Sequence, residues 1–386
     1  MPDLTNRPVF GAEHHEFRAL VREFLAREVL PNAEAWEQAG IMDKQVYKAA
    51  ASAGVLGFSV PEEYGGLGID DFRYNAIVAE ELAIAGGVAN GLALTLINDI
   101  LAPYLLRLTT EEQKQRWLVP LASGDMTFAI AMSEPGAGSD LAGIRTSARR
   151  DGDDWVINGQ KTFISNGILS DAVVVVCRTD PEAGHKGFSL IVVEDGAPGF
   201  ERGRKLDKIG LKTQDTAELY FADCRVPAGN LLGTEGRGFM HLMENLPSER
   251  LSIAISGIAG ARRTFEQTVQ YAKDRQAFGQ SIGSFQANRF TLAEMATELD
   301  IAQVYIDNCI SRVLDGTFSA VDASKAKWWC TELHKKVVDQ CLQLHGGYGY
   351  MLEYPVARDY QDVRISTILG GTTQIMKEII GRDLGF

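Results

Sequence analysis

The first third of the chain has hydrophobic residues at helical spacing. In the segment Phe17-Arg-Ala-Leu-Val-Arg-Glu-Phe-Leu25 apolar side chains recur three and four positions apart, with charged residues between them. That period places the apolar residues on one face of a helix. It continues from Glu13 to about Leu121 with short glycine-rich interruptions, and Thr110 before two glutamates is typical of a helix N-cap. The pattern predicts a helical domain over residues 1–124.

The middle third changes to short β-rich runs bounded by turn residues. Four runs rich in valine, isoleucine and aromatic residues are expected to be strands: Asp154–Asn158, Ala172–Arg178, Phe188–Val193 and Ala217–Phe221. The dipeptides Asp151-Gly152 and Asn158-Gly159 are typical of hairpin turns. The sequence therefore predicts a β domain, a sandwich or a barrel, over residues 125–234.

Helical periodicity returns over residues 235–386. Three long helices are expected, over Met240–Ala277, Ser284–Asp315 and Ala320–Leu344, and long helices in succession indicate a bundle. Helical, β and helical blocks in separate thirds indicate an α+β multidomain protein, not the alternation of a doubly wound parallel sheet. A Rossmann GxGxxG is also absent, because Gly136-Ala-Gly138 is followed by Leu141 where the third glycine belongs.

Composition excludes several classes of partner and site. The 51 acidic and 38 basic residues give a net charge of −13, which disfavours nucleic acid and anionic lipid surfaces. Five scattered cysteines without CxxC spacing, and six histidines without metal-binding spacing, predict neither disulfides nor a metal site. The polar N-terminus and the lack of a run of about 18 apolar residues lead us to expect a cytoplasmic protein without membrane insertion.

Several motifs carry a family resemblance. They are AMSEPGAGSD at Ala131–Asp140, GQKTFISNG at Gly159–Gly167, RQAFG at Arg275–Gly279, FQ at Phe285-Gln286, QLHGGYG at Gln343–Gly349 and EYP at Glu353–Pro355. In this order they closely resemble the acyl-CoA dehydrogenases over essentially the whole chain. The resemblance implies an N-terminal helical domain, a middle β domain and a C-terminal four-helix bundle.

The resemblance also implies an FAD site at a subunit interface, and hence a homotetramer. By this resemblance Met132 and Ser133 contact the flavin, and Phe163 and Ser165 lie against its ring. Residues that bind the FAD of a neighbouring subunit would be Arg275 at the pyrophosphate, Phe278 and Gln286. The cofactor site would be completed by Gln343, Gly346, Gly347, Thr372 and Gln374. Taken alone, the same stretches are ordinary loops, strands and helix ends.

The catalytic base is the one departure from the commoner pattern. Removal of a proton α to a thioester needs a carboxylate in a dry pocket. Many members of the family place it just before a Gly-Thr near the C-terminus, where this chain has Gly370. The long-chain and isovaleryl branches instead place a glutamate before an arginine on a helix, and Glu249-Arg250 resembles that arrangement. We therefore expect Glu249 to be the base, against the alternative of a solvated carboxylate paired with a lysine or arginine.

Substrate contacts follow from the same resemblance. Ser139 is expected to meet the CoA portion, Arg250 to lie in the substrate site, and the main-chain N–H of Gly370 to bind the thioester carbonyl together with a ribityl hydroxyl of FAD. The expected reaction converts a medium- or long-chain fatty acyl-CoA into the trans-2-enoyl-CoA and passes electrons to an electron-transfer flavoprotein.

Two other functions stay open. An acyl-CoA oxidase of similar fold would pass its electrons to oxygen, although oxidases of this fold commonly carry an additional C-terminal helical domain. A catalytically silent subunit that binds flavin or CoA is conceivable because of Gly370. The presence of Glu249 and of the interface residues argues against this second alternative.

Overall fold

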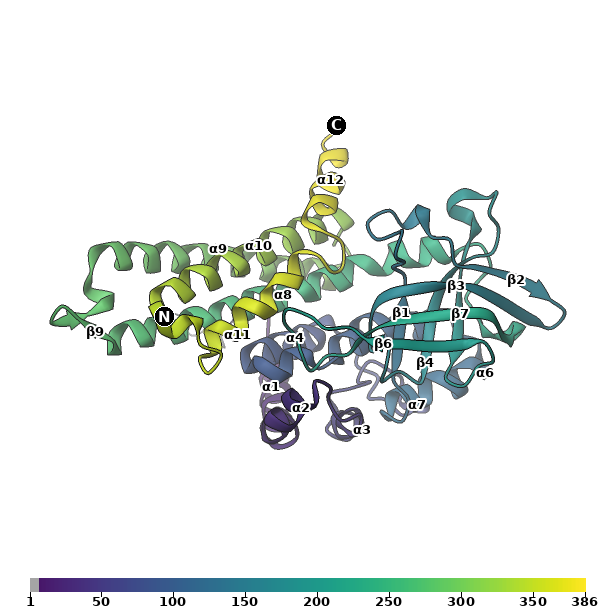
Figure 1. Ribbon diagram of the computed structural model, residues 1–386, viewed down its shortest axis with the longest axis horizontal. Coiled ribbons are helices and arrows are strands. Elements are labelled where there is room, and N and C mark those ends of the chain that lie inside the picture. Colours follow the sequence, from purple (N-terminus) through teal and green to yellow (C-terminus); the bar gives the residue numbers. More distant parts are fainter. Residues whose placement is uncertain (1–6) are drawn as a thin grey trace.

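The structure is a computed structural model that describes residues 7–386, in the order helices, sheet, helices (Figure 1). The N-terminal helices are α1 (Ala12–Phe24), α2 (Ala33–Ala39), α3 (Gln45–Ser52), α4 (Phe72–Ala85), α5 (Ala102–Leu108), α6 (Glu111–Gln113) and α7 (Val119–Ala122). The expected cap at Thr110 is confirmed: its hydroxyl accepts from the Gln113 N–H, and the Gln113 side chain accepts from the Thr110 N–H.

One helical run in this domain resembles a membrane span by length and composition. It covers Gly87–Leu108 and includes a π-helical segment, Leu96–Leu101, ahead of α5. The core helix of a soluble protein passes the same test, and 61% of the apolar window is buried inside the protein. The run is thus weak evidence for a membrane.

The middle domain is built on one mixed sheet. Its strands are β1 (Phe128–Ala131), β2 (Ser147–Asp151), β3 (Asp154–Ser165), β4 (Ala172–Arg178), β5 (Phe188–Glu194), β6 (Phe200–Lys205), β7 (Thr216–Pro227) and β8 (Leu231–Leu232). They lie in the order β6-β7-β3-β2-β4-β5-β8, with β1 paired to β4. A single residue pair, Ser147 with Arg178, joins β2 to β4.

Strand β4 shows how the sheet connects the two kinds of domain. Val173 and Val175 belong to a core shared by strands β3, β5 and β7, whereas Val174 and Val176 belong to the core of the helices. Alternate residues of a strand face opposite sides of the sheet. Both faces of β4 are therefore covered, which explains why its sequence is a continuous apolar run. One face of the sheet thus packs on a small core within the β domain, and the other face packs against the helices.

Of the two hairpin turns predicted from the sequence, one is confirmed and one is wrong. Asp151 pairs with Asp154 across a turn at Gly152. Gly159, by contrast, lies inside β3, at a register shift after Ile157. A Cβ on Gly159 would lie 2.7 Å from the Cα of Thr146, so the glycine permits close approach of two backbones rather than a turn.

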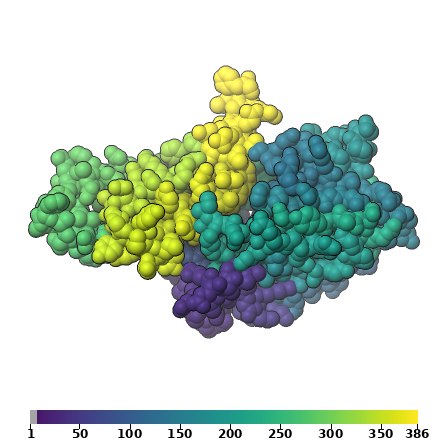
Figure 2. All heavy atoms as spheres, in the orientation of Figure 1, coloured from purple at the N-terminus to yellow at the C-terminus, as the bar shows by residue number. Residues whose placement is uncertain are grey.

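The C-terminal domain is an elongated bundle. It comprises α8 (Gly238–Asp274), the hairpin of β9 (Gln276–Ala277) and β10 (Gln280–Ser281), α9 (Gln286–Leu314), α10 (Ala320–His345), α11 (Pro355–Asp362) and α12 (Thr373–Asp383). Helices α8, α9 and α10 lie side by side, and α12 projects from the body (Figures 1 and 2). Helix α8 continues through Pro247 without interruption, and its 37 residues span about 55 Å. This helix carries the predicted base in its first third and reaches the β9–β10 hairpin at its C-terminal end.

Candidate active site

Glu249 lies on α8 and is buried, with 4% of its surface exposed. Its Oε1 accepts a hydrogen bond from Asn245 Nδ2 at 3.0 Å and one from the Tyr104 hydroxyl at 3.5 Å. Within residues 7–386 its carboxylate has no ion-pair partner within 4.0 Å. The alternative of a solvated, paired carboxylate is therefore wrong, since Glu249 is neither solvated nor paired.

The surroundings of Glu249 suit a base that works near neutral pH. Burial raises the pKa of Glu249 to about 7, and nearby Asp99 acts in the same direction, while the Asn245 donor and the charge of Arg250 act against them. Asp99 is itself buried, receives a hydrogen bond from Asn75 at 2.6 Å, and has its pKa raised by burial to about 7. No motif in the sequence indicated Asp99, Asn245 or Tyr104.

Gly370 and Gly371 form a turn beside α8, the helix that carries Glu249. Arg250 Nε donates to the Gly370 carbonyl at 3.1 Å, which ties α8 to the turn. Both glycines have positive φ, 64° and 103°, and a Cβ on Gly370 would lie 2.5 Å from Ile253 Cδ1. The position where many relatives carry the base is thus shaped for a residue without a side chain.

The loop with Met132 and Ser133 is fixed by a buried ion pair that sequence reasoning missed. Lys161 Nζ lies 2.9 Å from Glu134 Oε1 and also donates to the Met132 carbonyl at 3.0 Å. Glu134 further accepts from the N–H groups of Arg145 and Thr146. Burial alone would raise the pKa of Glu134, but Lys161 and these donors hold it below its usual value. The pair thereby joins the loop to β3.

Phe163 on β3 combines exposure with backbone strain. It is 70% exposed, and its φ of 61° lies in the left-handed region, within a register shift between Lys161 and Ile164. Such strain concentrates at ligand sites. Ser165 ends the same strand half-buried, and Asn166 beyond it is buried. An exposed aromatic ring beside the Met132–Ser133 loop fits a flat ligand such as a flavin.

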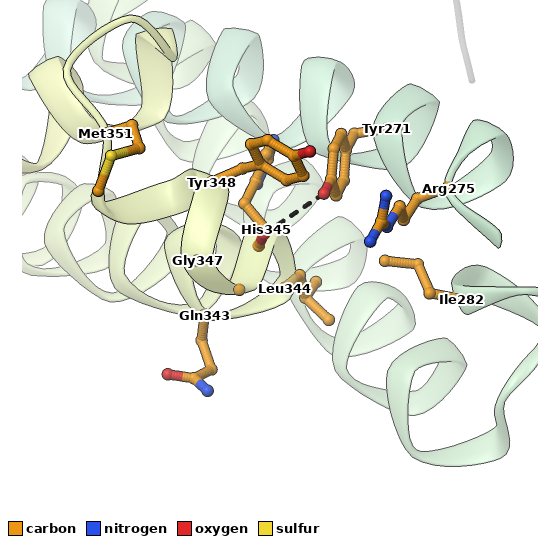
Figure 3. A pocket seen from close by; sticks show the side chains of 10 residues that line it. Tyr271, Arg275, Ile282, Gln343, Leu344, His345, Gly347, Tyr348 and Met351 are labelled. Carbon is orange, nitrogen blue, oxygen red and sulfur yellow. Dashed lines mark hydrogen bonds between the residues drawn. The ribbon is translucent and has the colours of Figure 1, made fainter. Parts of the chain in front are cut away.

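Arg275, Gln343, Gly346 and Gly347 line one hollow at the far end of α8. Its volume is about 540 Å³, and Tyr271 stacks on His345 there with ring centroids 4.1 Å apart (Figure 3). Tyr271 also donates to the His345 carbonyl at 3.3 Å. A Cβ on Gly346 or Gly347 would meet nothing within 4 Å, so bare backbone faces open space. An arginine, stacked aromatic rings and bare glycine backbone fit the adenosine and pyrophosphate of FAD.

The remaining predicted residues lie outside this hollow. Phe278, 95% exposed with φ 53°, occupies the turn of the β9–β10 hairpin, and Gln286 begins α9. Thr372 caps α12 and Gln374 follows it, both close in sequence to the Gly370 turn. Ser139 is exposed in the loop after β1.

The predicted FAD residues fall into separate groups. Phe163 lies on the β domain, whereas Arg275 precedes β9 at the opposite end of the molecule (Figure 1). Arg275 lies 26 residues beyond Glu249, a helical rise of about 39 Å. The structure therefore brings Met132, Ser133 and Phe163 together on the β domain, and Arg275, Gln343, Gly346 and Gly347 together at the far end of α8, but it does not bring these two groups together.

Comparison with known proteins gives the family of the chain. Family models match residues 11–125 (acyl-CoA dehydrogenase, N-terminal domain), 129–224 (middle domain) and 236–385 (C-terminal domain). The chain is 45% identical over its full 386 residues to the mitochondrial long-chain specific acyl-CoA dehydrogenase of Sus scrofa, of which 89% is covered.

Solved structures give the same result. An acyl-CoA dehydrogenase from Geobacillus kaustophilus has a TM-score of 0.95 and 49% identity, covering 98% of this chain and 99% of that one. A glutaryl-CoA dehydrogenase from Mycobacterium smegmatis in complex with FADH2 has a TM-score of 0.89 and 27% identity, covering 98% and 95%. This chain belongs to the acyl-CoA dehydrogenase family, in its long-chain branch, and is an FAD-dependent oxidoreductase.

Proposed function

We propose that the protein converts medium- and long-chain fatty acyl-CoA thioesters into trans-2-enoyl-CoA, with Glu249 as the base, and passes the electrons to an electron-transfer flavoprotein. The observation that carries this proposal is the buried, unpaired Glu249, held by Asn245 and Tyr104 and with its pKa raised to about 7 by burial. A base of this kind removes a proton efficiently near neutral pH. The rate should fall as the pH drops below about 7, because protonated Glu249 cannot accept the α proton.

Other residues of the chain would bind the flavin and position the thioester around this base. Met132, Ser133, Phe163 and Ser165 would hold the flavin ring, and Arg250 would keep the Gly370 turn in place for the thioester carbonyl. When bound, FAD supplies the acceptor for the hydride that leaves the β carbon. Burial of Glu249 excludes water from the base and so keeps its proton exchange with solvent low.

Substrate length and electron acceptor are tested together by anaerobic titration. Acyl-CoAs from butyryl-CoA to octadecanoyl-CoA are added to the purified protein, and bleaching of the flavin absorbance is followed. We expect bleaching with the medium and long chains, fast reoxidation by an electron-transfer flavoprotein and slow reoxidation by oxygen. Hydrogen peroxide formed at the full turnover rate would favour the oxidase, and a flavin that no acyl-CoA bleaches would favour the silent subunit.

The separation of the two halves of the cofactor site supports an FAD that bridges two copies of the chain in a homotetramer. Arg275→Ala should then lower FAD content and weaken assembly together, because a ligand held by both copies stabilises their association. Flavin absorbance and light scattering of the same sample measure both effects. Lys273→Ala, two residues earlier, on α8 and exposed, is the matched control. A stable monomer with full FAD would overturn the interface assignment.

A further inference from the structure

Two buried cationic side chains on different helices donate hydrogen bonds to the Gly370-Gly371 turn. Arg250 on α8 donates to the Gly370 carbonyl at 3.1 Å, and Lys327 on α10 donates to the Gly371 carbonyl at 2.6 Å. Lys327 has no exposed surface, and Arg250 is 7% exposed. Consecutive carbonyls of one turn are thus tied to the two central helices of the bundle, which fixes the orientation of the turn's N–H groups.

Neither cation has a carboxylate partner. Within the described part of the chain, Arg250 and Lys327 form no ion pair within 4.0 Å, whereas buried Lys161 pairs with Glu134. A buried charge without a carboxylate partner is costly, and the acceptors that these two cations have are the carbonyls of the turn. Only one of the three N–H donors of Lys327 is used by the described residues.

The charged groups around Lys327 come from three helices. Burial, and after it the charge of Arg250 on α8, lowers the pKa of Lys327 to about 8. Glu332 on α10 acts against them, but its carboxylate is engaged by Lys335 and by the Thr373 hydroxyl of α12. Lys377 of α12 also lies near Glu332. The N-terminus of α12, capped by Thr372, adds its own partial positive charge beside the turn.

The reaction creates negative charge beside this turn. As the Cα–H bond breaks, the proton passes to Glu249 and the electron pair moves toward the thioester carbonyl oxygen. When the hydride leaves the β carbon, that pair forms the Cα=Cβ bond and the carbonyl is restored. Preorganised positive charge near such an oxygen lowers the barrier.

We propose that Lys327 is a positioning residue for this reaction, which holds the Gly370-Gly371 turn with its N–H groups toward the thioester oxygen and, with Arg250, supplies positive charge for the enolate-like state. The inference rests on the proposed dehydrogenase function. It assigns a role to a lysine that lies 78 residues from Glu249 in the chain and on another helix.

The test compares Lys327→Met and Lys327→Arg with wild type. Anaerobic stopped-flow bleaching with hexadecanoyl-CoA should show a limiting rate about 10²-fold lower for Lys327→Met, the loss typical of a disabled oxyanion donor. The dissociation constant of hexadecanoyl-CoA should change less than about threefold, and FAD content should not change. Lys325→Met, exposed on the same helix, is the matched control and should bleach at the wild-type rate.

Two further readouts distinguish positioning from packing. Lys327→Met should weaken binding of 3-oxohexadecanoyl-CoA, taken up as its enolate, by about 10²-fold, while hexadecyl-CoA, a thioether without a carbonyl, binds as before. The wild-type rate should also fall as the pH rises through about 8, where Lys327 loses its proton. Lys327→Arg keeps the cation, so its rate should not fall there.

The outcomes separate the two proposals. Wild-type bleaching by Lys327→Met, or equal weakening of both analogues, would overturn the role of Lys327 while leaving the dehydrogenase function intact. If Lys327→Met does not fold, the pH dependence of the rate in the wild type and in Lys327→Arg decides. The same fall in rate at high pH in both proteins would overturn the proposal. A wild-type flavin that no acyl-CoA reduces would instead refute the proposed function, and the role of Lys327 with it.

Discussion

Glu249→Gln should lower the limiting rate of flavin reduction by about 10²–10⁴, the usual contribution of a positioned general base. Glutamine preserves the size of the side chain and can still accept a hydrogen bond from Asn245, so the pocket should keep its shape. Binding of FAD and of acyl-CoA should therefore be nearly unchanged. Anaerobic stopped-flow bleaching gives the rate, and equilibrium titration with hexadecanoyl-CoA gives the affinity.

Glu244→Gln provides the matched control for this experiment. Glu244 lies on the same helix but its side chain is 54% exposed, so replacing its carboxylate with an amide should leave the rate unaltered. A limiting rate near that of wild type in Glu249→Gln would show that another group takes the α proton. Loss of acyl-CoA binding in parallel with the rate would point to a role of Glu249 in binding instead.

Lys161→Met should destabilise the protein by about 3–5 kcal/mol, the usual cost of leaving one charge of a buried pair without its partner. Glu134 would keep only the N–H donors of Arg145 and Thr146. FAD content should fall as well, because the Met132 carbonyl loses the ammonium group that fixes it. Urea denaturation measures the free energy of unfolding, and the absorbance ratio of flavin to protein measures the cofactor.

The double variant Glu134→Gln/Lys161→Met separates charge from packing. Removing the second charge should recover most of the lost stability, since no unpaired carboxylate remains in the interior. FAD content should recover less, because the contact to Met132 is still missing. A double variant as unstable as Lys161→Met alone would show that lost packing of the lysine side chain, not the charge, causes the effect.

Strong periodicity made some elements predictable from the sequence. The predicted range of β4 matches the observed strand, and α10 differs by one residue, because each has an unbroken apolar pattern. Strands β2 and β6 were missed since their sequences, SARRD and FERGRK, are charged, and of their residues only Ala148 is buried. A strand held by its neighbours' hydrogen bonds needs no apolar face of its own.

The site was predictable only where a motif marks it. Glu249 and Arg275 were found through family resemblance, whereas the burial of Glu249 and the hollow around Arg275 depend on helices distant in sequence. Lys161 and Lys327 carry no local signal, because a lysine in a strand or helix is normally solvent-exposed. What distinguishes them is a tertiary contact, with Glu134 and with the Gly371 carbonyl.

The distance between Glu249 and Arg275 along α8 has a consequence for inheritance. If FAD bridges two copies as proposed, each active site takes its base from one copy and its pyrophosphate donor from another. A cell that makes both an E249Q and an R275A chain would assemble some sites from the intact half of each, and two inactive alleles would complement one another. Mixed with a normal chain, either defect alone would disable sites only in proportion to its share of the chains, because a defective chain still supplies its intact half to a neighbour, so the arrangement of one helix gives complementation without dominance.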